Sequence, residues 1–421
     1  MNRRLSQKLY DSKCGGSMSE MSNPEWRNVT LGQLGEVNRG RSRTRPRNAE
    51  HLYGGPYPFV QTGDVTASGG RISEHKQTYS QAGFEQSRLW PAETMCITIA
   101  ANIAETGVLQ FDACFPDSVV GFIADPTIAD VYFVEYMFRT LKRQIQHEAT
   151  GSVQDNINLA TLARLQFSLP PLTEQKAIAE VLGALDGKIA ANTQLSSSIE
   201  QLLALEVDAN WLDDLKTGDR PELIPMVDIF EINPSNSKPT VDLPLYLEMK
   251  KLPERGSGIS DWDYRPAKGG TRFQQGDSLM ARITPCLENR KTGFVDFLED
   301  GQVGIGSTEF IALRSRPGIP NELSYFLAVN SDFRDFAIRH MVGTSGRQRV
   351  SSSDIAAYYV PTPHSGWLRD FANRAETQFK FLKSLRDENR TLAATRDALL
   401  PQLMSGKLRV REFEKAVEAV V

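Results

Sequence analysis

Five arginines at alternating positions are the residues of this chain whose type and spacing most clearly predict chemistry. They are Arg39, Arg41, Arg43, Arg45 and Arg47, set in the run NRGRSRTRPRN at positions 38–48, which contains no acidic residue. The glycine, serine, threonine and proline between them cannot form an amphipathic core element, so we expect an extended or looped cationic segment. Guanidinium groups presented in this way suit phosphate contacts or insertion into a nucleic-acid groove. A solvated surface loop is the alternative interpretation.

Two polar turns containing glycine are further candidates for nucleic-acid contact. The first offers Gly151, Ser152, Gln154 and Asn156, and the second offers Arg347, Gln348 and Arg349. Carboxamides can pair with adenine in the major groove, and arginine can pair with guanine or with phosphate. The second half also carries scattered basic residues as possible counterparts of the arginine run: Arg265, Lys268, Arg272, Arg282, Arg290 and Lys291. Alternatively, both turns simply close a domain.

No catalytic constellation stands out in the sequence. An adenine methyltransferase needs an Asn/Asp-Pro-Pro-Tyr/Phe tetrapeptide, and the near misses at 169–172 (LPPL) and 233–236 (NPSN) lack its groups. The GxxxxGK[ST] phosphate loop of ATP-driven motors is absent. Fragments of a nuclease motif, Pro116-Asp117 and Glu248-Met249-Lys250, lie in different halves of the chain. Four cysteines without a CxxC pattern and five scattered histidines predict no metal site and a reducing cytoplasm.

Two long helices must position these candidate residues. Pro170 and Pro171 end the preceding segment, and Thr173 is a suitable N-cap for a helix that follows. Its apolar stripe is Ile178, Leu182, Leu185, Ile189, Ile199 and Leu203. A second stripe near the C-terminus is Phe371, Ala375, Leu382, Leu385, Leu392, Leu399 and Leu403. Spacings of three, four and seven residues predict coiled-coil-like helices, and Gly406 is a fitting C-cap.

The segments before the two helices repeat with a period of roughly 190 residues, which predicts a duplicated domain rather than a solenoid. Matching pairs are Glu36-Val37-Asn38 with Glu231-Ile232-Asn233, Ile97-Thr98 with Ile283-Thr284, Thr106-Gly107 with Thr292-Gly293, and Gly121-Phe122-Ile123-Ala124 with Glu309-Phe310-Ile311-Ala312. A Gly/Ser/Thr/Gln turn precedes each helix. The stretches that do not match are where two different specificities would lie.

The run LPPLTEQKAIAEVLGALDGKIAANT at 169–193 closely resembles the central region of type I restriction-modification specificity subunits, and LLPQLMSGKL at 399–408 resembles their C-terminal end. The resemblance covers almost the whole chain. It implies an α+β fold with two tandem, pseudo-symmetric target-recognition domains, separated by two long helices that pair as an antiparallel coiled coil. It also implies a non-catalytic subunit that reads a bipartite, asymmetric site on double-stranded DNA.

The resemblance further implies two methyltransferase subunits, each with an S-adenosylmethionine site, and two restriction subunits that use ATP and Mg²⁺. No cofactor would bind this chain itself. The expected segments are a disordered leader at 1–24, recognition domains at 25–168 and 209–360, spacer helices at 169–208 and 361–408, and a tail at 409–421. A pseudo-two-fold relation lets one chain present equivalent surfaces to two identical partners.

Composition leaves two rival functions open. A hydrophobic content of 40% and a charged content of 24% are ordinary for a globular protein, and the apolar runs are too short to cross a bilayer. The formal charge of −4 is unusual for a stand-alone nucleic-acid binder. A structural or partner-binding protein is therefore the chief rival, and a DNA-modifying enzyme is the second.

An asparagine interrupts each apolar stripe, at Asn192 and Asn389. Buried asparagine in a coiled coil lowers stability but can fix register. In an antiparallel pair, facing positions have a constant sum. Matching Thr173 with Met404 gives 577 and the asparagines give 581, about one turn apart. We therefore expect the asparagines to lie near the middle of the pair and within one turn of each other, where a hydrogen bond can join them. Side chains that face solvent or a partner are the alternative.

Overall fold

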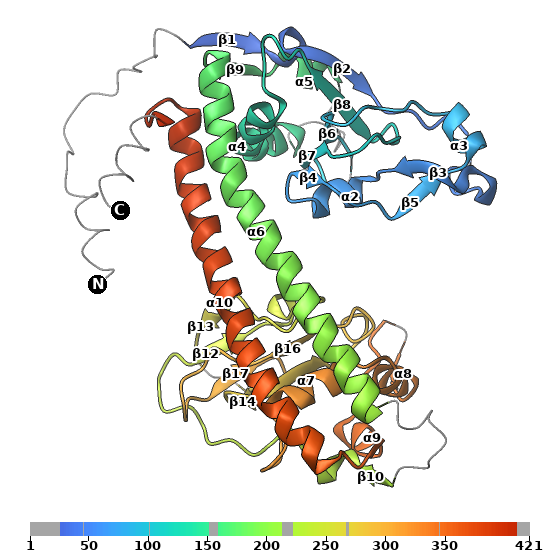
Figure 1. The fold of residues 1–421 in the computed structure, drawn as a ribbon, viewed down its shortest axis with the longest axis vertical. Helices are drawn as coiled ribbons and strands as arrows, with labels where there is room; N and C mark the ends of the chain where they lie inside the picture. Colours follow the sequence, from blue (N-terminus) through green and yellow to red (C-terminus); the bar gives the residue numbers. More distant parts are fainter. Residues whose placement is uncertain are drawn as a thin grey trace, which may run out of the picture. The chain divides into compact units, whose positions relative to one another are not determined.

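The computed structural model describes residues 26–44, 46–100, 102–150, 159–212, 222–266, 269–344 and 346–410. The chain forms two compact units (Figure 1). Unit 1 comprises residues 1–185 and 395–421, and unit 2 comprises residues 186–394. Each unit therefore contains one α+β body and part of each of two long helices. The described residues include no helix long and apolar enough to cross a bilayer.

Unit 1 is built on a five-stranded sheet ordered β2-β8-β6-β7-β4. The strands are β2 (Gly35–Arg39), β4 (Arg71–Ile72), β6 (Met95–Thr98), β7 (Thr106–Leu109) and β8 (Val119–Ala124). Strands β6 and β7 are buried along their whole length because apolar side chains cover both faces. Met95 contributes to a core shared with helix α4 (Val131–Thr150), whereas Cys96 faces a second core that contains Trp90 and Phe115.

Smaller elements complete unit 1. Strand β1 (Arg27–Thr30) pairs antiparallel with β9 (Gln166–Leu169), and β3 (Tyr53–Phe59) pairs antiparallel with β5 (Gln77–Tyr79). The short helices are α2 (Thr62–Ala67), α3 (Gln81–Glu85) and α5 (Leu159–Arg164), with single turns η1 (Leu31–Gln33) and η2 (Glu50–Leu52).

Unit 2 repeats this topology. Its first sheet is ordered β11-β18-β15-β16, the same order as β2-β8-β6-β7, and β10 pairs with β19 as β1 pairs with β9. The strands are β10 (Leu223–Pro225), β11 (Phe230–Ile232), β15 (Ser278–Ala281), β16 (Thr292–Phe294), β18 (Phe310–Ser315) and β19 (Tyr359–Pro361). The duplication expected from the sequence is therefore present in the fold.

A second sheet, ordered β13-β12-β17-β14, distinguishes unit 2 from unit 1. It consists of β12 (Leu245–Leu247), β13 (Asp263–Tyr264), β14 (Thr271–Phe273) and β17 (Gly304–Gly306). The helices are α7 (Asn321–Val329), α8 (Ser331–Arg339) and α9 (Ser352–Ala356), with turns η5 (Met226–Asp228) and η6 (Met249–Lys251).

Strand register identifies equivalent positions in the two units. In unit 1, Cys96 lies opposite Gly107 on β7. In unit 2, Leu279 lies opposite Gly293 on β16. The predicted match of Thr106-Gly107 with Thr292-Gly293 is therefore confirmed.

Two other predicted matches are wrong. The neighbour of Cys96 on β8 is Gly121, and the neighbour of Leu279 on β18 is Ala312, so Gly121 corresponds to Ala312 and not to Glu309. The expected match of Ile97-Thr98 with Ile283-Thr284 is displaced by the same three residues. A short Phe-Ile-Ala run occurs in both halves of the sequence, and matching these two runs displaced the alignment of the halves by three residues. The hydrogen-bonded partners across each sheet give the correct equivalence.

The two long helices are α6 (Leu172–Val207), which continues into the π-helical turn η3 (Asp208–Leu212), and α10 (Ser365–Met404). In unit 2, Glu206 near the end of α6 accepts hydrogen bonds from Trp367 and Arg374 near the start of α10. The pair is therefore antiparallel, as expected (green and red in Figure 1). Gly406 takes a φ of 68° and its N–H donates to the Leu403 carbonyl, as expected of a C-cap.

Candidate nucleic-acid interface

The arginine run begins where β2 ends, and neighbouring segments hold its backbone. The N–H of Gly40 donates to the Val119 carbonyl at 2.9 Å, and the N–H of Arg41 donates to the Phe115 carbonyl at 3.1 Å. A Cβ at Gly40 would lie 2.3 Å from the Pro116 carbonyl oxygen, so the close approach requires glycine here. These contacts fix the course of the chain before any arginine side chain is considered.

Side chains anchor the same segment on its inner side. Ser42 is only 6% exposed, the Ser87 hydroxyl donates to the Arg41 carbonyl at 2.9 Å, and the Thr44 N–H donates to Gln86 Oε1 at 2.8 Å. Gly40 and Ser42 are buried, whereas the arginines on either side are exposed. Alternation in an extended chain therefore turns the small residues inward and the arginines outward.

The structure separates the arginines into paired and unpaired groups. Within the described part of the chain, Arg39, Arg41 and Arg43 make no ion pair. Arg47 instead contacts both carboxylate oxygens of Asp117 at 2.8 Å. We name residues 39–44 the arginine segment. Its cations recur about every 6.6 Å along an extended backbone, and Arg45 lies outside the described residues.

In unit 2, the described residues that follow the equivalent strand β11 do not form an arginine segment. Asn38 on β2 corresponds to Asn233, whose N–H donates to the Ala312 carbonyl at 2.7 Å. The residues that follow are Pro234-Ser235-Asn236-Ser237-Lys238, with one cation. The basic residues proposed from the sequence as counterparts of the arginine run lie in other parts of unit 2.

Several of those basic residues bond to the body of unit 2. Arg272 donates to the Asn236 carbonyl at 2.6 Å, and Lys291 donates to the Leu252 carbonyl at 3.0 Å. Arg290 donates to the Val329 carbonyl at 3.2 Å, and the Arg282 backbone pairs with Glu309 and Val350. Their contact with DNA stays a prediction. Lys268, together with Gly151, Ser152, Gln154 and Asn156 of the first polar turn, lies outside the described residues.

The second polar turn is part of a small hairpin. The backbone groups of Val342 and Arg349 exchange two hydrogen bonds of 2.9 Å, and the Arg347 N–H donates to the Thr344 carbonyl. Gly346 has a φ of 80°, which favours glycine at this tip. Arg347 is exposed, whereas Gln348 and Arg349 are half-buried. We call residues 342–350 the Arg347 hairpin; residue 345 lies outside the described residues.

Glu309, which no sequence motif marks as a functional residue, controls the charge at the base of this hairpin. The Arg349 guanidinium meets both Glu309 oxygens at 2.7–2.8 Å and lowers the pKa of that carboxyl below its usual range. Arg282 Nε lies 4.0 Å from the same carboxylate. No sequence signal joins residues forty positions apart, so only the fold could reveal this pair.

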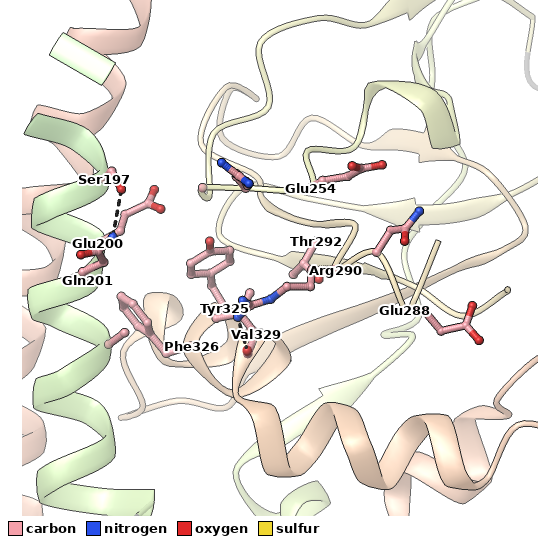
Figure 2. Close-up of a pocket in the computed structure, with 14 residues that line it drawn as sticks. Ser197, Glu200, Gln201, Glu254, Glu288, Arg290, Thr292, Tyr325, Phe326 and Val329 are labelled. Atoms are coloured by element: carbon pink, nitrogen blue, oxygen red, sulfur yellow. Dashed lines mark hydrogen bonds between the residues drawn. The ribbon is translucent and has the colours of Figure 1, made fainter. Parts of the chain in front are cut away.

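A polar cavity of about 680 Å³ in unit 2 is a poor candidate for phosphate contact. Figure 2 shows Glu200 and Tyr325 on its walls, together with Glu254 and Glu288. Burial, followed by the nearby Glu200 carboxylate, raises the pKa of Tyr325 well above its usual value. Three carboxylates and two guanidinium groups, those of Arg255 and Arg290, line this cavity, so its lining carries one more acidic than basic side chain and does not favour a phosphate. No cluster of three or more metal-ligating side chains occurs among the described residues.

The two stripe asparagines meet in unit 2. Asn192 is 3% exposed, and its Nδ2 donates to Asn389 Oδ1 at 3.0 Å and to Glu388 Oε2 at 2.7 Å. Asn389 in turn donates to the Thr193 hydroxyl at 3.3 Å. The expected hydrogen bond is present, and the role of these residues in fixing register stays a prediction.

Comparison with known proteins agrees with this architecture. Residues 23–201 match the family model described as the type I restriction modification DNA specificity domain. The MjaIX specificity subunit of Methanocaldococcus jannaschii is 21% identical over 420 residues, covering 92% of this chain and 95% of that subunit. The EcoEI specificity subunit of Escherichia coli is 28% identical over 183 residues, covering 42% of this chain and 29% of that subunit.

A solved structure shares the fold. The S subunit of a type I restriction-modification system from M. genitalium aligns with a TM-score of 0.55 at 15% identity, covering 91% of this chain and 98% of that one. The matches to the MjaIX subunit and to the M. genitalium S subunit each cover more than nine-tenths of this chain. Over most of its length the chain is therefore similar to specificity subunits of type I restriction-modification systems, and the match to the DNA specificity domain lies in residues 23–201.

Proposed function

We propose that this chain reads a bipartite, asymmetric DNA site, with each unit reading one half, and that it joins two methyltransferase and two restriction subunits. The observation that supports this most strongly is the duplicated sheet order β2-β8-β6-β7 and β11-β18-β15-β16, each closed by an equivalent strand pair. Two copies of one body can each face one half-site. The loops differ between the two bodies, and loops commonly carry the side chains that contact bases. Each unit can therefore read a different base sequence.

The charge distribution supports a division of work between the units. Unit 1 presents three arginines on one extended segment that make no ion pair with any described residue, which suits phosphate contact. Unit 2 presents Arg347 on a hairpin instead. Because the chain has a formal charge of −4, we propose that partner subunits share the contact with DNA.

The long helices suit a spacer between two reading bodies. Helix α6 has 36 residues and is therefore about 54 Å long, against about 35 Å for one turn of B-DNA. A flexible linker would leave the distance between half-sites undefined, whereas a paired helix is stiff. S-adenosylmethionine, ATP and Mg²⁺ would bind the partner subunits.

Methylation mapping tests this proposal. DNA exposed to the chain together with its methyltransferase subunits and S-adenosylmethionine should carry adenine methylation at a two-part motif with a fixed gap. The methyltransferase subunits without this chain should leave that motif unmethylated, and the chain alone should transfer no methyl group. Methylation of the same motif without the chain, or by the chain alone, would overturn the proposal.

A further inference from the structure

The base of the Arg347 hairpin is fixed on two sides. On one side, Val342 and Arg349 exchange backbone hydrogen bonds of 2.9 Å. On the other side, the Thr284 N–H donates to the Gln348 carbonyl at 3.1 Å, and the Val350 N–H donates to the Arg282 carbonyl at 3.0 Å. The hairpin strand that carries Arg349 therefore lies between two neighbouring backbone segments, and its position depends on both.

A side-chain clamp adds to this backbone pairing. Arg349 Nε lies 2.8 Å from each Glu309 oxygen, and its Nη2 lies 2.7 Å from Oε1. Glu309 directly precedes β18, and its carbonyl accepts the Arg282 N–H at 3.0 Å. A two-point arginine–carboxylate contact fixes orientation as well as distance. The clamp therefore connects the hairpin to the central sheet of unit 2.

The clamp also changes which arginine can meet a phosphate. The Arg349 guanidinium already donates its hydrogen bonds to the Glu309 carboxylate, so it is not free to donate them to a phosphate. Removing this guanidinium would leave the Glu309 carboxylate without its arginine partner beside the hairpin. Arg347, two residues away, is exposed and makes no side-chain hydrogen bond or ion pair among the described residues. Arg347 is therefore a better candidate than Arg349 for direct contact with a phosphate.

Resting on the proposed function, we infer that Glu309 and Arg349 are positioning residues that hold the hairpin so that Arg347 contacts the half-site read by unit 2. Arg349 then holds the hairpin in place and does not contact DNA, although the sequence of the second polar turn predicted that it would. Glu309 becomes a determinant of recognition even though its negative charge opposes DNA.

Salt dependence of binding by the assembled complex separates contact from positioning. A lost phosphate contact lowers the slope of log K against log salt by about 0.9, which is about an 8-fold loss of affinity at 0.1 M salt. We expect that reduction for Arg347→Ala. For Arg349→Ala and Glu309→Ala we expect weaker binding to the specific site with the slope unchanged. If Arg349→Ala lowers the slope and Arg347→Ala does not, the assignment is overturned.

A charge exchange and a matched control sharpen the test. The double variant Glu309→Arg with Arg349→Glu keeps the pair and should recover binding that each single variant loses. Arg316→Ala removes an arginine that pairs with Glu231 at 3.6 Å just beyond the other end of β18, and it should leave specific binding unchanged. No recovery in the double variant, at unchanged melting temperature, would contradict a positioning pair.

Amide hydrogen exchange gives a readout that needs no DNA. In Glu309→Ala, the amides of Val342 and Arg349 should exchange faster, while those of β18 remain protected. Unchanged exchange would remove the basis for positioning. Failure of the proposed function gives a different result, because the wild-type complex would then show no preference for any two-part site. If the wild type does show that preference and Arg347→Ala binds like wild type, only the present inference fails.

Discussion

Replacing Arg41 and Arg43 with alanine should weaken DNA binding by the assembled complex in a strongly salt-dependent way. Both guanidinium groups are exposed and have no ion-pair partner among the described residues. The backbone that carries them is held by hydrogen bonds with Phe115, Ser87 and Gln86, and none of these bonds involves an arginine side chain. The substitution should therefore remove charge without disturbing the fold.

The magnitude follows from counterion release. If each arginine neutralises one phosphate, the slope of log K against log salt falls by about 0.9 for each, or about 1.8 for the pair. That corresponds to about a 60-fold loss of affinity at 0.1 M salt and about a 20-fold loss at 0.2 M. Fluorescence anisotropy with a labelled duplex, measured over a range of salt concentrations, gives both slope and affinity.

Arg47→Ala is the matched control, because Arg47 belongs to the same run but is paired with Asp117. We expect its effect on the slope to be well below that of either Arg41 or Arg43. An unchanged slope and affinity in the Arg41/Arg43 double variant, with a normal melting temperature, would show that the arginine segment is only a solvated loop and refute the reasoning.

Three further predictions follow from the helices and from Glu309. Asn192→Leu alone should destabilise the helix pair by about 1–3 kcal/mol, because it removes the hydrogen bonds from buried Asn192 to half-buried Asn389 and to exposed Glu388. Urea unfolding should show the double variant Asn192→Leu with Asn389→Leu to be at least as stable as wild type, and a double variant less stable than the single one would contradict this. Inserting seven residues into both α6 and α10, opposite each other, preserves the apolar stripe and lengthens each helix by about 10 Å. Methylation mapping should then show the gap between the two half-sites lengthened by about three base pairs with both half-sites unchanged, and an unchanged gap would exclude a spacer role. The Glu309 carboxyl has a lowered pKa in the folded state, so the stability that it contributes is present above the unfolded pKa of 4.5 and is lost as pH falls through the lower folded pKa. The difference in melting temperature between wild type and Glu309→Gln should therefore shrink below about pH 4.5, and a difference that does not depend on pH would contradict the ion pair.

The long helices were predictable because their signal is local. Apolar residues at spacings of three, four and seven are visible in the sequence, and the proline pair and Gly406 mark the ends. Even the meeting of Asn192 and Asn389 follows from a constant sum of positions in an antiparallel pair. Such arguments need only the helical period and one matched pair of ends.

Strand register and charge pairing were not predictable in the same way. The match of Gly121 with Glu309 was based on similar residues in the two sequences. Cross-strand hydrogen bonds instead place Gly121 opposite Cys96 and Ala312 opposite Leu279, so Ala312 is the residue of unit 2 that is equivalent to Gly121. Likewise, Arg47 finds Asp117 across 70 residues of chain. A basic residue in a sequence therefore marks a DNA contact only after its possible carboxylate partners are placed.

The most direct test of the two-unit account is a methylation map of a chimeric complex. Residues 26–168 would be replaced by the corresponding segment of another type I specificity subunit, with both helices and unit 2 left intact. The account predicts that one half of the recognised motif changes while the other half and the gap are kept. A change in both halves, or a single uninterrupted motif in the wild type, would contradict the claim that each unit reads its own half-site.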